Sequence, residues 1–268
     1  MDLFASDAKI GNYVFSEHHI ILSSFNFDDS CDMGMSNTIS EQFLGSASVP
    51  RFLGTSYDSK LTGKFTVMLN ACDTDGRYVF TLEECRDFLK RFTGVNGYQK
   101  LTLKHDDSWD NYYYNIHINN VSYEKNGKFV VGIGMEFECD SQFAWEEVII
   151  TKEIETVGES ITIENESDSL YEYTYPITTI SDTDDVTNYK LKNTSDDNRE
   201  SIISSISSGH TIIMDSGLST IKDSSGSLMS DKFNFKFLRL IPGNNVIEVS
   251  HPSSIQFKML IPRKVGWF

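Results

Sequence analysis

The amino-acid sequence predicts a mainly β protein with one notable α-helix, divided into two β-rich domains. Apolar residues recur at every second position in several runs, whereas only one segment has helical spacing. After Trp145, Ser, Thr, Asp and Asn become frequent between short apolar runs, and helix signals disappear. The length of 268 residues fits two ordinary domains, which we place at residues 1–148 and 149–268.

The first half carries the longest alternating runs. Three sets of apolar residues occupy every second position: Phe65, Val67 and Leu69; Tyr112, Tyr114, Ile116 and Ile118; and Phe129, Val131, Ile133, Met135, Phe137 and Cys139. Successive side chains of a strand point to opposite faces, so such alternation is typical of a half-buried strand. Three strands are therefore expected here.

One segment, residues 81–93, has the spacing of a helix. Its apolar face is predicted to consist of Leu82, Cys85, Phe88, Leu89 and Phe92. Thr81 and Glu84 have the spacing of a capping box, and Phe80 precedes the helix where a hydrophobic staple to Cys85 requires it. Gly94 supplies the stop signal.

The second half is predicted to contain only short strands. It opens with a polar passage at the domain boundary, made of Glu146, Glu147, Lys152, Glu153 and Glu155. Three alternating runs follow: Tyr171, Tyr173 and Tyr175, ended by Pro176; Phe233, Phe235 and Phe237; and Ile255, Phe257, Met259 and Ile261. Between the last two, Ile241-Pro242-Gly243-Asn244 matches a type II turn. Many short strands with turn signals indicate a β-sandwich or jelly roll.

Charge argues against several classes of function. The chain has 23 Lys and Arg against 39 Asp and Glu, a net charge of −16. Residues 146–268 hold 11 basic and 19 acidic residues, so each half carries −8. Such a surface repels nucleic-acid phosphates and anionic headgroups. We therefore expect no direct nucleic-acid binding.

No secretory or membrane segment is expected. Asp2, Asp7 and Lys9 interrupt the N-terminal residues, which lack the apolar run of a signal peptide, and no stretch reaches the ~20 apolar residues of a membrane span. We expect synthesis in a cytoplasm and no membrane insertion. The cysteines are Cys31, Cys72, Cys85 and Cys139; they form no CxxC pair, and we interpret them as buried small hydrophobes.

No catalytic, cofactor-binding or metal-binding residue is predicted. Asp73, Asp75, Gly76, Glu83 and Glu84 have the residue types of a calcium loop, but Gly76 falls at position 4 rather than 6 when Asp73 is position 1, so a polar turn is expected. The histidines are His18, His19, His105, His117, His210 and His251; they form no HxxxH or HExxH pair. His18 and His19 are expected on opposite faces of a strand. Ser208-Gly209-His210 is interpreted as a turn.

Aromatic residues leave a second class of function open. Trp109, Trp145, Trp267 and Tyr171 are candidates for stacking on sugars, although exposed aromatics in β-sandwiches are more often part of an interface or a core. A carbohydrate-binding module for host adhesion is therefore the alternative. A wall-degrading enzyme is a third hypothesis, but no residue pattern names its nucleophile or metal.

The order of elements resembles the distal tail proteins of long-tailed (siphovirus-like) bacteriophages. In the first half, the Leu61–Leu69 strand leads into the capped helix, then Leu101-Thr102-Leu103 and an acidic turn with Asp106, Asp107 and Trp109. A Tyr112–Val121 strand and a long strand that ends at Glu136–Asp140 complete this half. The second half shows Tyr175-Pro176-Ile177, then Phe233 to Leu240, the Leu240–Asn245 turn, and Arg263 to Phe268 at the close.

The resemblance implies more than the residues themselves indicate. It implies a ring-forming (belt) N-terminal domain and a galectin-like C-terminal β-sandwich. It also implies a hexameric virion component at the tail tip or baseplate, which joins the tail tube protein to the tail hub protein and the receptor-binding proteins. No enzyme activity, cofactor or metal is expected of such a subunit.

Overall fold

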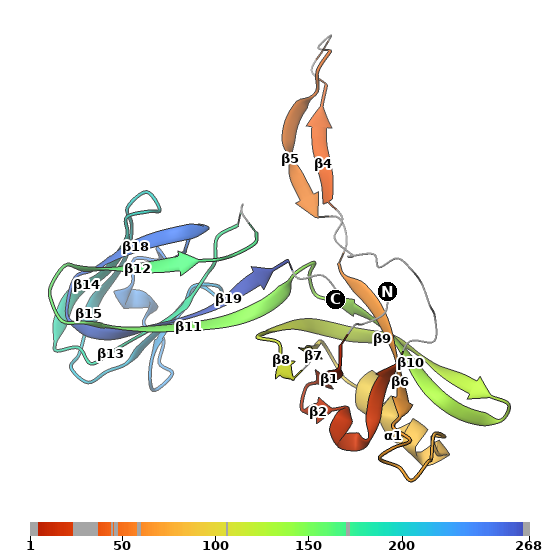
Figure 1. Cartoon of the computed structure of the whole chain (residues 1–268). Helices are drawn as coiled ribbons and strands as arrows, with labels where there is room; N and C mark the ends of the chain where they lie inside the picture. Colours follow the sequence, from red (N-terminus) through yellow and green to blue (C-terminus); the bar gives the residue numbers. More distant parts are fainter. Residues whose placement is uncertain are drawn as a thin grey trace. The chain divides into compact units, whose positions relative to one another are not determined.

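The computed structural model describes residues 5–23, 37–43, 45, 48–57, 60–105, 107–169 and 172–264. The chain forms two compact units, the first running to Ala144 and the second comprising Trp145–Arg263 (Figure 1). The described residues are mainly β with a single α-helix, which confirms the predicted fold class. None of the helices in this part of the chain is long and apolar enough to cross a membrane.

The first unit is built on an antiparallel sheet with the strand order β2-β1-β7-β9-β10-β6-β3, and β8 pairs with the free stretch of β7. The strands are β1 (Asp7–Ile10), β2 (Tyr13–Val14), β3 (Ile20–Ser23), β6 (Thr62–Leu69), β7 (Gln99–His105), β8 (Ser108–Trp109), β9 (Tyr112–Asn126) and β10 (Phe129–Cys139). A 3-10 turn, η1 (Ser16–His18), joins β2 to β3. Two further strands, β4 (Asn37–Gln42) and β5 (Arg51–Tyr57), form a separate two-stranded sheet.

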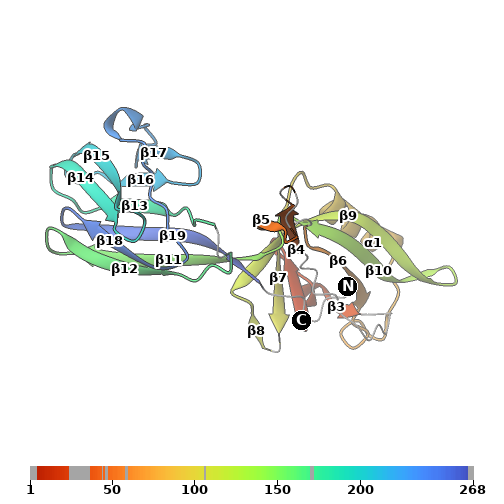
Figure 2. The same cartoon turned by 90° about the horizontal axis from the view of Figure 1, so that it is seen from above.

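The predicted alternation forms the core of this unit. On β6, Phe65, Val67 and Leu69 are buried, and β9 and β10 bury most of their predicted residues in the same cluster. The prediction for Phe129 was wrong, because its side chain is 50% exposed. The β9–β10 ribbon extends beyond the helix there, and a register shift between Val130 and Gly132 interrupts the alternation (Figures 1 and 2).

The helix α1 (Leu82–Thr93) lies on one face of this sheet and has the predicted cap. The Glu84 amide donates to Thr81 Oγ1 at 3.2 Å, and the Thr81 amide donates to the Glu84 carboxylate at 2.7 Å. Cys85, Phe88 and Phe92 are buried as predicted. Leu82, by contrast, is 88% exposed, because Phe80 just before the helix fills that end of the core.

The second unit contains two antiparallel sheets, in the strand orders β17-β16-β13-β19-β11 and β12-β18-β14-β15. The strands are β11 (Ala144–Ile154), β12 (Glu159–Asn165), β13 (Ile177–Ser181), β14 (Val186–Asn193), β15 (Arg199–Ile206), β16 (Ile212–Asp215), β17 (Thr220–Asp223), β18 (Gly243–Val249) and β19 (Ser253–Arg263). A 3-10 turn, η2 (Ser230–Lys232), follows β17. The polar passage of the sequence is most of strand β11, where Glu147 pairs with Lys258 of β19 at 2.7 Å.

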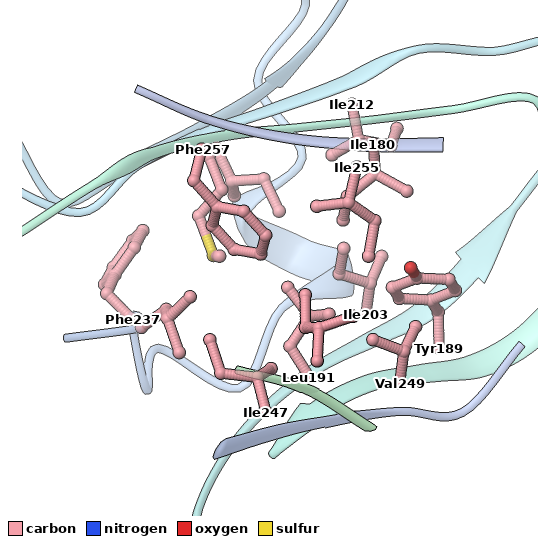
Figure 3. Packing of buried hydrophobic residues seen from close by; sticks show 14 of the residues in the cluster. Ile180, Tyr189, Leu191, Ile203, Ile212, Phe237, Ile247, Val249, Ile255 and Phe257 are labelled. Carbon is pink, nitrogen blue, oxygen red and sulfur yellow. The ribbon is translucent and has the colours of Figure 1, made fainter. Parts of the chain in front are cut away.

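The core of the second unit lies between its two sheets. Ile180, Ile255 and Phe257 from one sheet face Leu191, Ile247 and Val249 from the other (Figure 3). The Tyr189 hydroxyl, which is buried among them, is within 2.7 Å of Ser253 Oγ, so its polar atom is satisfied. The apolar alternation of residues 255–261 is thus confirmed as strand β19.

Two of the predicted strands in this unit do not form. Residues 172–176 contain an isolated β-bridge between Thr174 and Leu240, and Tyr171 lies outside the described residues. Residues 233–237 contain only the bridge of Phe233 to Ile203, because Phe235 adopts a left-handed conformation (φ 58°) that no strand can accommodate.

Three other predictions need correction or fall outside the structure. Cys85 and Cys139 are buried as predicted, but Cys72 is exposed in the turn after β6, where its amide donates to Asn70 Oδ1; Cys31 lies outside the described residues. His18 ends the η1 turn and His19 caps it with φ 59°, so these two histidines are not on a strand.

Candidate interaction surfaces

We call the side of the β4–β5 hairpin that carries Ile39 and Phe52 its apolar face, although Glu41 lies on the same side. On β4, Ile39 and Glu41 project from the same side, and Glu41 pairs with Phe52 of β5. The opposite side carries Ser40 and the pair of Gln42 with Arg51. A register shift between Ser40 and Glu41 gives the hairpin its one irregularity.

The apolar face of this hairpin is nevertheless exposed. Ile39 is 58% exposed and Phe52 is 61% exposed, and Phe43, Val49 and Leu53 nearby are exposed to a similar degree. A two-stranded hairpin is at best marginally stable alone in water, and burial of a large apolar side chain stabilises by about 1.5–3 kcal/mol. The hairpin therefore gains most of its possible stabilisation only when another surface covers it.

A recess of about 250 Å³ lies between α1 and the segment that joins β2 to β3. Its floor includes the buried Phe80 and Phe88, and its rim carries a stack of three side chains. The Tyr13 ring lies 4.0 Å from the His18 ring with nearly parallel planes, and the Arg91 guanidinium lies 4.8 Å from the Tyr13 centroid. Burial raises the pKa of Tyr13, partly opposed by Arg91.

An ion pair fixes the helix N-terminus at this recess. Arg77 donates two hydrogen bonds of 2.8 Å to the Glu84 carboxylate, which also closes the capping box with Thr81. The Arg77 hydrogen bonds lower the pKa of Glu84 to about 2; burial opposes them, and the hydrogen bonds with Thr81 add to the lowering. The carboxylate stays charged at the positive end of the helix dipole, which holds the first turn rigid.

In the second unit, three buried asparagines hold the connection into β18, and we call them the asparagine cluster: Asn165, Asn193 and Asn245. Asn245 Oδ1 accepts from the Ile241 amide and from Asn193 Nδ2, both at 2.9 Å. Asn245 Nδ2 donates to the carbonyls of Ile241 at 2.8 Å and Gly243 at 3.0 Å. Gly243 has φ 86°, as the predicted type II turn requires. Hydrogen bonds that satisfy buried polar groups within this chain therefore explain the sequence motif at Ile241–Asn245.

Exposed aromatic residues also occur beside the asparagine cluster. Tyr173 and Tyr175 are partly exposed, with ring centroids 6.4 Å apart. The Arg239 guanidinium stacks on Tyr173 at 3.9 Å and is fixed by the nearly buried Asp196, at 2.7 and 3.0 Å. Two rings and a rigid guanidinium thus form a small platform on the surface of the second unit.

The remaining sequence candidates fall at separate places. Asp73 and Asp75 lie in the predicted polar turn, where Asn70 donates to Asp73 at 2.6 Å. Ser208-Gly209-His210 forms the predicted turn, with Gly209 at φ 73°. Across the described ranges, no group of three or more His, Cys, Asp and Glu side chains could hold a metal ion. Lys9 stacks on the partly exposed Trp109, Trp145 belongs to β11, and Trp267 lies outside the described residues.

The hairpin has only a weak signal in the sequence. The alternation of Ile39, Glu41 and Phe43 was visible in the sequence, but the run is short and contains a charge, so it lacks the continuous apolar pattern of a core strand. Phe52 and Leu53 are adjacent in the sequence, and only the register shift explains their positions.

Two family models together match most of the chain. A phage tail protein N-terminal domain matches residues 4–141, and a phage tail C-terminal domain matches residues 143–259. No curated protein shows significant sequence similarity to the chain.

Solved structures share this fold at low sequence identity. The chain is similar to the Dit protein of phage SPP1, described as a paradigm of the hub adsorption apparatus in phages that infect Gram-positive bacteria. The TM-score is 0.66 at 10% identity, over 95% of this chain and 98% of that chain. A chain of the phage P2 baseplate in its activated conformation with calcium gives a TM-score of 0.54 at 12% identity, over 98% and 99%. A strontium form of that baseplate gives 0.55 at 12% identity, over 95% and 97%.

Proposed function

This chain belongs to a phage tail protein family and is a component of the virion tail, and we propose that it serves there as a non-enzymatic structural subunit of the tail tip. The predicted resemblance to distal tail proteins is confirmed at the level of fold by the likeness to the Dit protein of phage SPP1. In this role, copies of the chain form a hexameric ring that connects the tail tube protein to the tail hub protein and the receptor-binding proteins.

The exposed apolar face of the β4–β5 hairpin is the observation that carries this proposal. In an isolated chain, Ile39 and Phe52 expose apolar surface to water, which is unfavourable. A ring needs a head-to-tail interface, in which one surface of each copy covers a different surface of the next. The hairpin supplies one such surface, and an obligate ring interface is expected to bury about 2,000 Å² or more.

The two halves divide the work. Residues 1–148 form the ring domain, which carries the hairpin and the recess beside α1. Residues 149–268 form the galectin-like sandwich, which offers its outer surfaces to receptor-binding proteins. Such a subunit acts through its shape and its contacts with other proteins, so no catalytic, cofactor-binding or metal-binding residue is assigned. The net charge of −16 favours contact with proteins over nucleic acid.

Mass measurement of the purified chain over a range of concentrations tests the ring. We expect six copies in a closed assembly, either alone or in the presence of the tail tube and hub proteins. Phe52→Ser should weaken assembly at least 10-fold, because it removes an apolar side chain worth about 1.5–3 kcal/mol from each interface. Val157→Ser, which changes a residue of the second unit that is 74% exposed, is the matched control. A chain that stays monomeric at every concentration, even with tail components, contradicts the proposal.

A second candidate function is carbohydrate binding in host adhesion. The platform of Tyr173, Tyr175 and Arg239 supports it, since aromatic faces beside polar groups suit sugar rings. Binding of the full chain to host wall polysaccharide, lost in Tyr175→Ala and kept in Trp109→Ala, would favour this function. No binding by the wild-type chain removes it.

A further inference from the structure

The segment of residues 228–240 closes one side of the sandwich in the second unit. It begins on edge strand β17, where Leu228 bridges to Lys222 and the Met229 amide donates to the Ile221 carbonyl at 3.0 Å. It then passes to the edge strand of the other sheet, β15, where Phe233 bridges to Ile203. An uncovered edge strand invites pairing with other chains, so this segment protects both edges.

Asn234 fixes the segment against β15 with its side chain. Asn234 Oδ1 accepts from the Ile202 amide at 3.1 Å and from the Lys236 amide at 3.2 Å, and Nδ2 donates to the Glu200 carbonyl at 2.9 Å. Its own amide donates to the Ile202 carbonyl at 3.2 Å. These bonds replace the ladder that a regular strand would form. The backbone on either side of Asn234 is therefore held in one conformation.

Phe235, the next residue, is both strained and exposed. Its φ is 58°, a region that costs a bulky side chain about 1 kcal/mol or more. The other non-glycine residues with positive φ in the described ranges are His, Asp, Asn and Ser, which suit turns. Phe233 and Phe237 on either side are buried with ring centroids 4.7 Å apart, whereas Phe235 is 66% exposed. The Phe235 ring lies 6.2 Å from the Phe233 ring, and most of it is open to solvent.

The segment that carries Phe235 differs in charge from the chain as a whole. Lys232 and Lys236 flank it and are both exposed, and within residues 230–240 only Asp231 is acidic. The chain as a whole carries −16. An exposed apolar ring between two cations is complementary to an apolar pocket bordered by carboxylates.

The described recesses of this chain do not match that description. The recess beside Tyr13 has Arg91 and His18 next to Glu84 and Asp87, and a recess of about 350 Å³ beside Val157 is lined by Lys190 and Lys192 as well as Glu200 and Glu248. In a second copy of the chain, neither of these two recesses would therefore be bordered by carboxylates alone.

We propose that Phe235 is a preformed anchor through which the second unit docks a different protein of the tail tip, at an apolar pocket bordered by carboxylates. This inference rests on the proposed function only in placing the chain at the tail tip. A preordered aromatic side chain loses little conformational freedom on binding, which is why such residues dominate binding energy at interfaces.

Thermal unfolding tests the strain. Phe235→Asn places a residue that tolerates positive φ at this position, and we expect the midpoint of thermal unfolding of the purified chain to rise by about 2–4 °C. Leu218→Asn, which changes a residue of the same unit that is 75% exposed but is not among the positive-φ residues, should leave the midpoint unchanged or lower it. A midpoint that falls in Phe235→Asn would show that the ring stabilises the chain itself, and would overturn the proposal.

Photo-crosslinking in assembled tails tests the partner. With p-benzoylphenylalanine in place of Phe235, we expect a crosslink to a different tail protein, at a peptide that contains Asp or Glu; the same probe in place of Leu218 is the control. The crosslinked protein, once purified, should bind Phe235→Asn at least 10-fold more weakly than the wild-type chain. Equal binding, crosslinks only between copies of this chain, or no crosslink at position 235 would each overturn the anchor. Absence of the chain from purified tails by mass spectrometry would instead contradict the proposed function.

Discussion

The turn around Asn245 and the β4–β5 hairpin are both short pieces of antiparallel structure, but they distribute their side chains in opposite ways. The turn brings polar side chains into the interior and gives each of them partners from the same chain. The hairpin carries Ile39 and Phe52 on its surface and finds no cover for them among the described residues. The first region is complete within one chain, and under the proposed function the second is completed in an assembly.

This difference separates stability from assembly within one subunit. A buried amide that loses its partners costs about 1–3 kcal/mol per group, so the turn should tolerate few substitutions in the isolated chain. An exposed apolar side chain contributes little to the fold of the chain that carries it, so the hairpin should tolerate many. Removal of a side chain at the turn is therefore expected to destabilise the isolated chain, whereas removal of a side chain at the hairpin is expected to weaken assembly and to leave the isolated chain nearly as stable.

The largest effect is expected for Asn245→Ala. The change removes the acceptor of the Ile241 amide and the donor to the carbonyls of Ile241 and Gly243, and it leaves Asn193 without one of its partners. We expect the free energy of unfolding to fall by about 3 kcal/mol in urea titration. Asn244→Ala, at the exposed neighbouring position, should change it by less than about 0.5 kcal/mol. Similar values for the two variants would show that the cluster is not what holds the turn.

A smaller effect is expected from the helix cap of the first unit. Glu84 has a pKa of about 2 in the folded chain against an ordinary value of 4.5, so its ionised form stabilises the fold. This stabilisation is complete above pH 4.5 and is lost as the pH falls from 4.5 toward 2. The side chain is 38% exposed, so solvent screening limits the contribution to about 0.5–1 kcal/mol.

Glu84→Gln isolates this contribution, because glutamine can still close the capping box but cannot pair with Arg77 as an ion. Urea titrations of both proteins should differ at pH 7 and converge as the pH is lowered toward 3. A difference that stays constant over this interval would assign the stabilisation to something other than the charge of Glu84.

The sequence predicted the regions that are complete within one chain better than the region that is not. The runs at Phe65 and Ile255 have continuous period-two patterns because their side chains pack against the same molecule, and the Thr81 cap depends on residues three apart. In the run of Phe233, Phe235 and Phe237, by contrast, the Asn234 side chain makes hydrogen bonds in place of a strand ladder, and no strand forms. No spacing rule of the sequence reveals such a replacement. The hairpin has only a short signal in the sequence, because its exposed apolar residues pack on no other described part of the chain.

The smallest effect is expected for Phe52→Ser in the monomeric chain. Its size tells whether the hairpin packs on its own chain or leaves its apolar face free for a neighbour. Phe52 is 61% exposed, so the free energy of unfolding measured at concentrations where the protein is monomeric should change by less than about 0.5 kcal/mol. At concentrations where the wild type assembles, the same variant should unfold earlier, because stability then includes the assembly equilibrium. A loss of 2 kcal/mol or more in the monomer (about the value of a fully buried side chain) would mean that the hairpin packs on its own chain, and the apolar face would no longer be available to a neighbour.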